Sequence, residues 1–74
     1  MIENEAVAAS VNQRLQDSYR ILEESILDVN RLCSAEEAEA YRQKVSKAFS
    51  VLVFDLMEPL YKKHPQLKPP RWDD

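Results

Sequence analysis

The side chains best suited to nucleophilic or metal chemistry occur once each: the chain has one histidine, His64, and one cysteine, Cys33. Nucleophilic catalysis needs a base beside the nucleophile, and a zinc site needs several ligands. Nothing around either residue has triad or metal-ligand spacing. We therefore expect His64 to be structural or solvent-exposed and Cys33 to be a small buried packing residue. The sequence predicts no catalytic residues, no metal and no cofactor.

Charged residues leave two further functions open. Arg14, Arg42 and Lys44 flank the expected helix seams and could hold a carboxylated substrate if they lay inside a bundle, so a small helical enzyme is the third interpretation. The alternative function is a nucleic-acid-associated regulator that uses a basic C-terminal stretch. That stretch comprises Lys62, Lys63, His64, Lys68 and Arg71. The net charge of −3 argues against nucleic acid as the partner, because domains that bind it broadly are usually basic.

The composition indicates that helices must position all of these groups. The 74 residues include no glycine, the residue that tight hairpins and phosphate-binding loops require. Strong helix formers such as alanine, leucine, glutamate and lysine are abundant, so the predicted class is all-α. A chain this short is near the limit of independent stability. One cysteine cannot form an internal disulfide, which leaves oligomerisation as the remaining route to stability.

The sequence shows no signal for export or membrane insertion. Its first residues are acidic, with no basic region before an apolar stretch. No apolar run approaches the ~20 residues of a membrane helix. We expect a soluble cytoplasmic protein with no membrane partner.

A heptad seam predicts the first helix over about residues 4–32. This range has no proline, and small or apolar residues recur at alternating steps of three and four. The seam is Ala8, Val11, Leu15, Ser18, Leu22, Ser25, Val29 and Leu32. Tyr19, Ile26 and Cys33 widen it on one flank. The two serines indicate close approach of a neighbouring helix or a large residue opposite.

The spacing of Ser34 and Glu37 predicts a capping box that starts a second helix over about 35–63. The turn near 32–34 is short enough to make the two helices antiparallel. Pro59 removes a backbone donor, which predicts a kink near residue 59, and His64 before Pro65 ends the helix. The predicted domain is therefore a helical hairpin over residues 1–64.

Folding the chain about residues 33 and 34 pairs positions whose numbers sum to roughly 67. Tyr41 then lies opposite Ser25 or Ile26, and Phe49 lies opposite Ser18. Pairs of large and small side chains are what a packed layer requires. The two seams are therefore consistent with each other.

The segment 48–57 has more apolar circumference than one neighbouring helix can cover. At about 100° per residue its apolar side chains point almost all the way round, and an exposed patch of that kind usually marks a protein–protein surface. We expect a second copy to cover it in a four-helix bundle. The predicted interface is Val51, Val53, Phe54, Met57 and Leu60. The favoured function is thus a small homodimeric helical interaction module, an adaptor or regulator that can also bind another protein, and not an enzyme.

Asp55 is the one carboxylate within this apolar run. We expect it to be partly shielded and satisfied by a neighbour, for which Arg14 and Asn12 are the nearest candidates. A buried polar residue can fix the register of a bundle. The other interpretation makes Asp55 part of a ligand pocket.

Residues 65–74 contain three prolines, which predict an extended, polyproline-like tail. Leu67 and Trp72 could dock back across the bundle, or the tail could stay free to bind a partner. The sequence leaves these two alternatives open.

Overall fold

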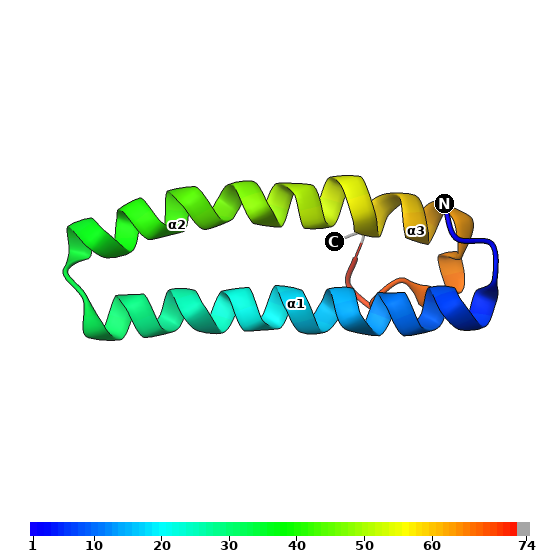
Figure 1. Ribbon diagram of the computed structural model, residues 1–74, viewed down its shortest axis with the longest axis horizontal. Helices are drawn as coiled ribbons and strands as arrows, with labels where there is room; N and C mark the ends of the chain where they lie inside the picture. The colour runs from blue at the N-terminus through cyan, green and yellow to red at the C-terminus, as the bar shows by residue number, and fades with distance from the viewer. Residues whose placement is uncertain (73–74) are drawn as a thin grey trace.

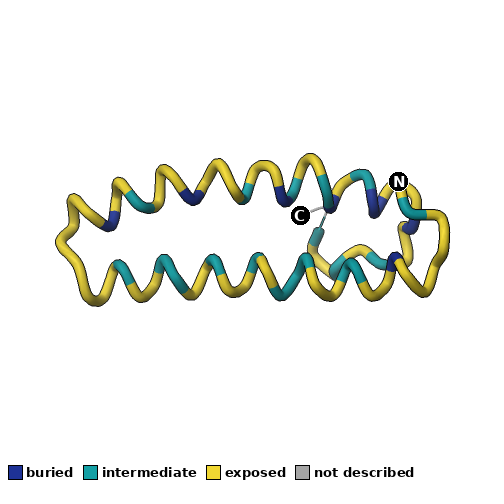
Figure 2. Tube along the Cα trace, viewed as in Figure 1, coloured by how far each residue is buried: buried dark blue, intermediate teal, exposed yellow. Residues whose placement is uncertain are grey.

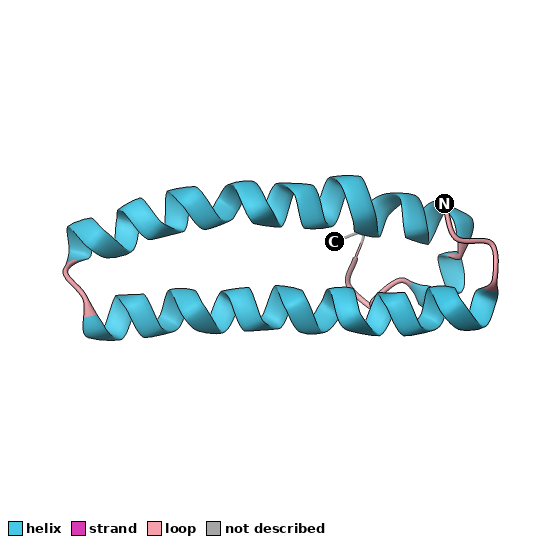
Figure 3. Cartoon of the chain, viewed as in Figure 1, coloured by secondary structure: helices cyan, strands magenta, loops and turns pink. Residues whose placement is uncertain are grey.

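A computed structural model of the chain describes residues 1–72, and every regular element in that range is helical (Figure 3). The all-α prediction is therefore confirmed. Helix α1 (Glu5–Leu32) forms one arm. The other arm consists of α2 (Ala35–Ser50), the π-helix η1 (Val51–Met57) and α3 (Glu58–Lys63). The two arms lie side by side and run in opposite directions (Figure 1).

Side chains cap both long helices at their first turns. The side-chain oxygen of Asn4 accepts a hydrogen bond of 2.9 Å from the backbone amide of Val7 and so starts α1. Ser34 accepts one of 3.2 Å from the amide of Glu37, whose carboxylate accepts in return from the Ser34 amide at 3.4 Å. The capping box predicted at the start of α2 is confirmed. Such caps satisfy amides that have no partner inside the helix.

Two pairs of side chains fix how the arms align along their length. The hydroxyl groups of Ser25 and Tyr41 are hydrogen-bonded at 2.8 Å. The rings of Tyr19 and Phe49 lie 4.6 Å apart between centroids, so Phe49 packs one residue away from the expected Ser18. Both pairs lie within one residue of the expected register.

The second arm changes its helical geometry before Pro59 and not at it. The amide of Glu58 donates to the carbonyl of Val53, five residues earlier, which is the bonding pattern of a π-helix. In an α-helix the proline ring would press on the carbonyl four residues before it. The widened turn relieves that crowding, and α3 continues through Pro59 to Lys63.

The well-buried core occupies the end of the rod that is far from the turn. It consists of Ala8, Leu52, Met57, Leu60 and Tyr61. Towards the turn only Ala38 and Val45 are buried among the described residues, and most of the trace there is exposed (Figure 2).

Contacts between the two chain ends close the end of the rod that holds the core. The His64 ring is buried, and its Nε2 lies 2.6 Å from the Ile2 carbonyl oxygen. Lys63 forms an ion pair of 2.9 Å with Glu3. His64 therefore has the structural role that the sequence allowed. Cys33, in contrast, is exposed beside the turn, because α1 ends just before it and no element covers that end.

The sequence predicted an extended tail, but the tail is not extended throughout. It begins with a 3-10 helix, η2 (Pro65–Leu67), because proline suits the first position of a helical turn as well as extended backbone. Leu67 and Trp72 are half-buried against the core. Of the two alternatives for the tail, the structure shows the docked one.

The protein is a thin rod of 45 × 21 × 16 Å with a radius of gyration of 14.5 Å. A globular chain of this length has a radius of gyration of about 11 Å. The accessible surface is 5472 Å², whereas a folded monomer of this mass exposes about 4700 Å². The single chain thus leaves about 800 Å² more surface in water than is usual for its mass.

Candidate self-association surface

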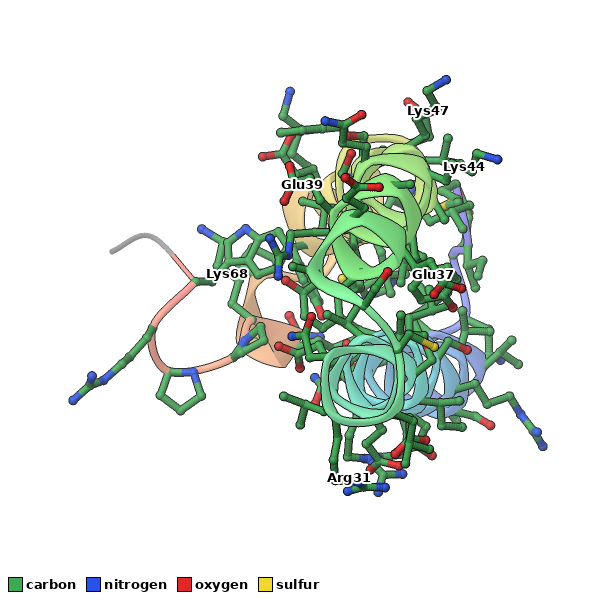
Figure 4. All side chains as sticks on the ribbon, turned by 90° about the vertical axis from the view of Figure 1, so that its left-hand side faces the viewer. Arg31, Glu37, Glu39, Lys44, Lys47 and Lys68 are labelled. Atoms are coloured by element: carbon green, nitrogen blue, oxygen red, sulfur yellow. The ribbon has the colours of Figure 1, made fainter. Side chains whose placement is uncertain are left out.

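The tail covers one side of the two-arm layer, and the opposite side is covered only at the core end, where the first residues cross to reach Lys63 and His64. The view along the rod in Figure 4 shows the tail with Lys68 on one side, and Glu37 and Lys44 on the other. The amide of Asn12 donates to the Leu67 carbonyl at 3.4 Å on the tail side. We call this side the tail side and the opposite one the open face.

Heptad spacing sorts the side chains of α1 between the two sides. The seam facing the second arm is Ala8, Leu15, Leu22 and Val29, at seven-residue spacing. Asn12 and Tyr19, four residues after a seam position, lie on the tail side, where Asn12 binds the tail and Tyr19 lines a hollow beside it. The other flank therefore belongs to the open face. It carries Val7, Val11, Arg14, Ser18, Ile21, Ser25, Asp28 and Leu32.

The second arm contributes a matching stripe. Tyr41 lies on the open face because its hydroxyl reaches Ser25. Steps of three and four residues from Tyr41 define the rest of the stripe. It comprises Glu37, Tyr41, Lys44, Ala48 and Val51. Figure 4 independently places Glu37 and Lys44 on this side.

Four large apolar side chains of the open face are half or more exposed. The exposed fractions are 50% for Val7, 58% for Ile21, 73% for Leu32 and 53% for Val51. Sequence reasoning recognised Val51 and placed Leu32 in the seam, but it missed Val7 and Ile21. The recurrence of Val7, Arg14 and Ile21 every seven residues on the second flank was the signal that could have found them.

The serine hydroxyls on this face already have partners within the chain. Ser18 donates to the Arg14 carbonyl at 2.8 Å, and Ser25 bonds both the Leu22 carbonyl at 2.6 Å and Tyr41. A partner could cover them without leaving a donor unsatisfied, which would otherwise cost about 1–3 kcal/mol. Burying the open face therefore leaves no serine hydroxyl unsatisfied, and its polar character comes from the charged side chains Arg14, Asp28, Glu37 and Lys44.

The predicted interface residues do not all lie on this surface. Val51 does, whereas Phe54 is exposed but stands one turn before Glu58, which lines a hollow on the tail side. Val53 is half-buried against the core. Met57 and Leu60 are buried inside the single chain, so the surface available to a partner excludes them. The π-turn and the docked chain ends supply the cover that the expected pair of helices lacked.

Asp55 is exposed rather than shielded, contrary to the sequence expectation. Within residues 1–72 its carboxylate has no hydrogen bond or ion pair, and Arg14 has no ion-pair partner either. Asn12 instead accepts from the Tyr61 hydroxyl and from the side chain of Gln16. The widened helical turn of η1 carries Asp55 away from the neighbours expected for it.

The tail forms two hollows on its own side of the rod. One, of about 280 Å³, is lined by Gln16, Tyr19, Arg20, Glu23, Met57, Pro69 and Trp72. The other, of about 350 Å³, is lined by Glu58, Tyr61, Lys62, Pro65, Lys68 and Trp72. Trp72 stands between them and meets the Tyr61 ring edge to face at 4.9 Å. Glu58 lies among the lysines here, and Lys63 is paired with Glu3, so the basic stretch does not form one uniform basic patch.

Tyr61 is a buried core residue whose hydroxyl has a shifted pKa. Burial raises the pKa of its hydroxyl, and a hydrogen bond with Gln16 opposes part of that rise.

Within residues 1–72 no three histidine, cysteine or acidic side chains are grouped so that they could hold a metal ion. No helix in the described part of the chain is both long and apolar enough to cross a bilayer.

Comparisons of the chain with protein-family models, with curated proteins and with solved structures found no match.

Proposed function

We propose that the protein is a homodimeric helical interaction module in which the open face of one copy packs on the open face of a second, completing a four-helix bundle. The observation that carries the proposal is the surplus surface of about 800 Å². Stable interfaces bury about 800 Å² on each partner. One further copy would therefore bring the exposed surface per chain close to that of an ordinary folded protein.

The chemistry of the open face supports the same partner. Val7, Ile21, Leu32 and Val51 supply apolar area, and removing such area from water stabilises association by about 25 cal/mol per Å². Ser18 keeps its backbone bond when it is covered. A bundle of four helices buries a wider stripe on each helix than a pair can. The role proposed is one of binding, as an adaptor or regulator, rather than of catalysis.

Sedimentation equilibrium tests the proposal directly. At tens of micromolar the sedimenting mass should be twice the chain mass of 8.6 kDa, and dilution should shift it towards one chain. X-ray scattering on the same samples should give a particle thicker than the 16 Å of the single rod. A mass of one chain across the whole concentration range would refute self-association.

A further inference from the structure

The charges of the open face indicate how the two copies are oriented. Arg14 has no ion-pair partner within residues 1–72, and neither has Asp55. Asp55 follows Val51 by four residues, close to one turn of the π-helix, which continues the open-face stripe of the second arm. Lys44 on the same stripe has no ion pair within these residues either. A partner is therefore offered one cation by α1, and one carboxylate and one cation by the second arm.

Both groups lie at nearly the same height along the rod. Tyr19 packs beside Phe49, and further from the turn Tyr61 bonds Asn12. These two cross-arm pairs bracket Arg14 on α1 and Asp55 on the second arm.

We infer that the second copy stacks with its turn at the same end of the bundle, so that each α1 packs on the η1-bearing arm of the other copy. This inference rests on the proposed dimerisation. A twofold axis along the rod then sets every α1 residue opposite a second-arm residue of the same height. Arg14 of each copy meets Asp55 of the other, which forms two ion pairs per dimer.

Side-chain sizes match in this arrangement. Ile21 of one copy lies opposite Ala48 of the other, and Val51 lies opposite Ser18. A large side chain against a small one lets the layers of a bundle interdigitate. Ile21 and Val51 are among the most exposed apolar residues of the chain, and each meets one of the small positions on this face.

The reverse stacking fits less well. In this stacking the turns lie at opposite ends and the twofold axis is perpendicular to the rod. If the axis passes at the height of Ile21, α1 packs on α1 and the two copies of Ile21 meet each other. Glu37 of one copy then approaches Asp55 of the other, which brings two carboxylates together. Like charges facing each other across an interface oppose association. The reverse stacking would also set Arg14 of one copy opposite Asp28 of the other, but Asp28 already pairs with Arg31 at 3.1 Å. Only turns at the same end bring Arg14 to Asp55, which has no ion pair within residues 1–72.

Single cysteines distinguish the two stackings. In a Cys33→Ser background, Ile21→Cys and Ala48→Cys are made in separate chains, mixed, exchanged and oxidised. We expect a disulfide-linked heterodimer from the mixture and little self-linking of either variant alone, because disulfides need Cα atoms within about 7 Å. Self-linking of Ile21→Cys alone would establish the reverse stacking. Failure of the mixture to link, in samples that sediment as dimers, would also overturn the inference.

A charge exchange gives a second, independent test. Arg14→Asp and Asp55→Arg should each raise the dimer dissociation constant about tenfold, because each puts like charges together twice per dimer. The double variant should recover the original constant. If the unmodified protein sediments as a single chain, the result counts against the proposed function itself. A dimer whose double variant is weaker than either single variant would count against the stacking alone.

Discussion

Ile21 and Leu27 are exposed to nearly the same extent on α1, 58% and 62%, yet they lie on different sides of the helix. Ile21 belongs to the open-face flank. Leu27 is five residues after the seam position Leu22, which places it on the outer surface, away from the second arm. The two residues therefore separate the effect of apolar exposure from the effect of position.

We predict that Ile21→Asp prevents dimerisation, because it places a carboxylate at the centre of the proposed interface. An ion buried without a partner costs several kcal/mol, so the dissociation constant should rise by about 100-fold or more. Leu27→Asp is the matched control and should leave it unchanged. Sedimentation at a series of concentrations measures both. Equal effects of the two substitutions would mean that the interface is elsewhere.

The docked tail should contribute measurably to stability. Trp72 packs on Tyr61 and is half-buried. Trp72→Ala is expected to lower the free energy of unfolding by about 2 kcal/mol, less than for a fully buried tryptophan. Arg71→Ala, at the exposed neighbouring position, is the control. Urea unfolding at one fixed protein concentration compares them, and an unchanged midpoint for Trp72→Ala would show that the docked tail adds no stability.

Stability should fall at alkaline pH because of Tyr61. Burial raises the pKa of its hydroxyl, so the folded chain keeps a proton that the unfolded chain loses above about pH 10. The contribution of Tyr61 to the free energy of unfolding is complete below about pH 10 and is lost as the pH rises through the raised pKa. The midpoint temperature of thermal unfolding should therefore fall more steeply between pH 8 and 11 for the unmodified protein than for Tyr61→Phe. Parallel declines would contradict this role of Tyr61.

The capping box should set the stability of the turn end, where few residues are buried. Ser34→Ala removes the acceptor for the Glu37 amide and is expected to cost about 1 kcal/mol. Ser46→Ala is the control, since the Ser46 hydroxyl only donates to a backbone carbonyl within its own helix. Urea titration followed by circular dichroism gives both values. The prediction fails if the two alanine variants unfold at the same urea concentration.

The sequence was sufficient for the features that depend on neighbouring residues. The absence of glycine and the heptad spacing predicted helices, and Ser34 with Glu37 predicted the start of α2, because these signals act within one or two helical turns. The alignment of Ser25 with Tyr41 also followed from the short turn, which leaves little freedom in register. Local bonding and periodicity thus determined the elements and their approximate pairing.

Tertiary structure alone decided which apolar residues are covered. Met57 was predicted at the surface but is buried, while Ile21 drew no attention and is exposed. The π-turn rotates the residues after Val51 relative to an ideal helix, and the docked chain ends cover the core at one end of the rod. The cover that the chain ends supply depends on contacts between segments some fifty or more residues apart, such as Asn12 with Leu67. Burial is a property of the whole packed chain, so helical periodicity could not assign it.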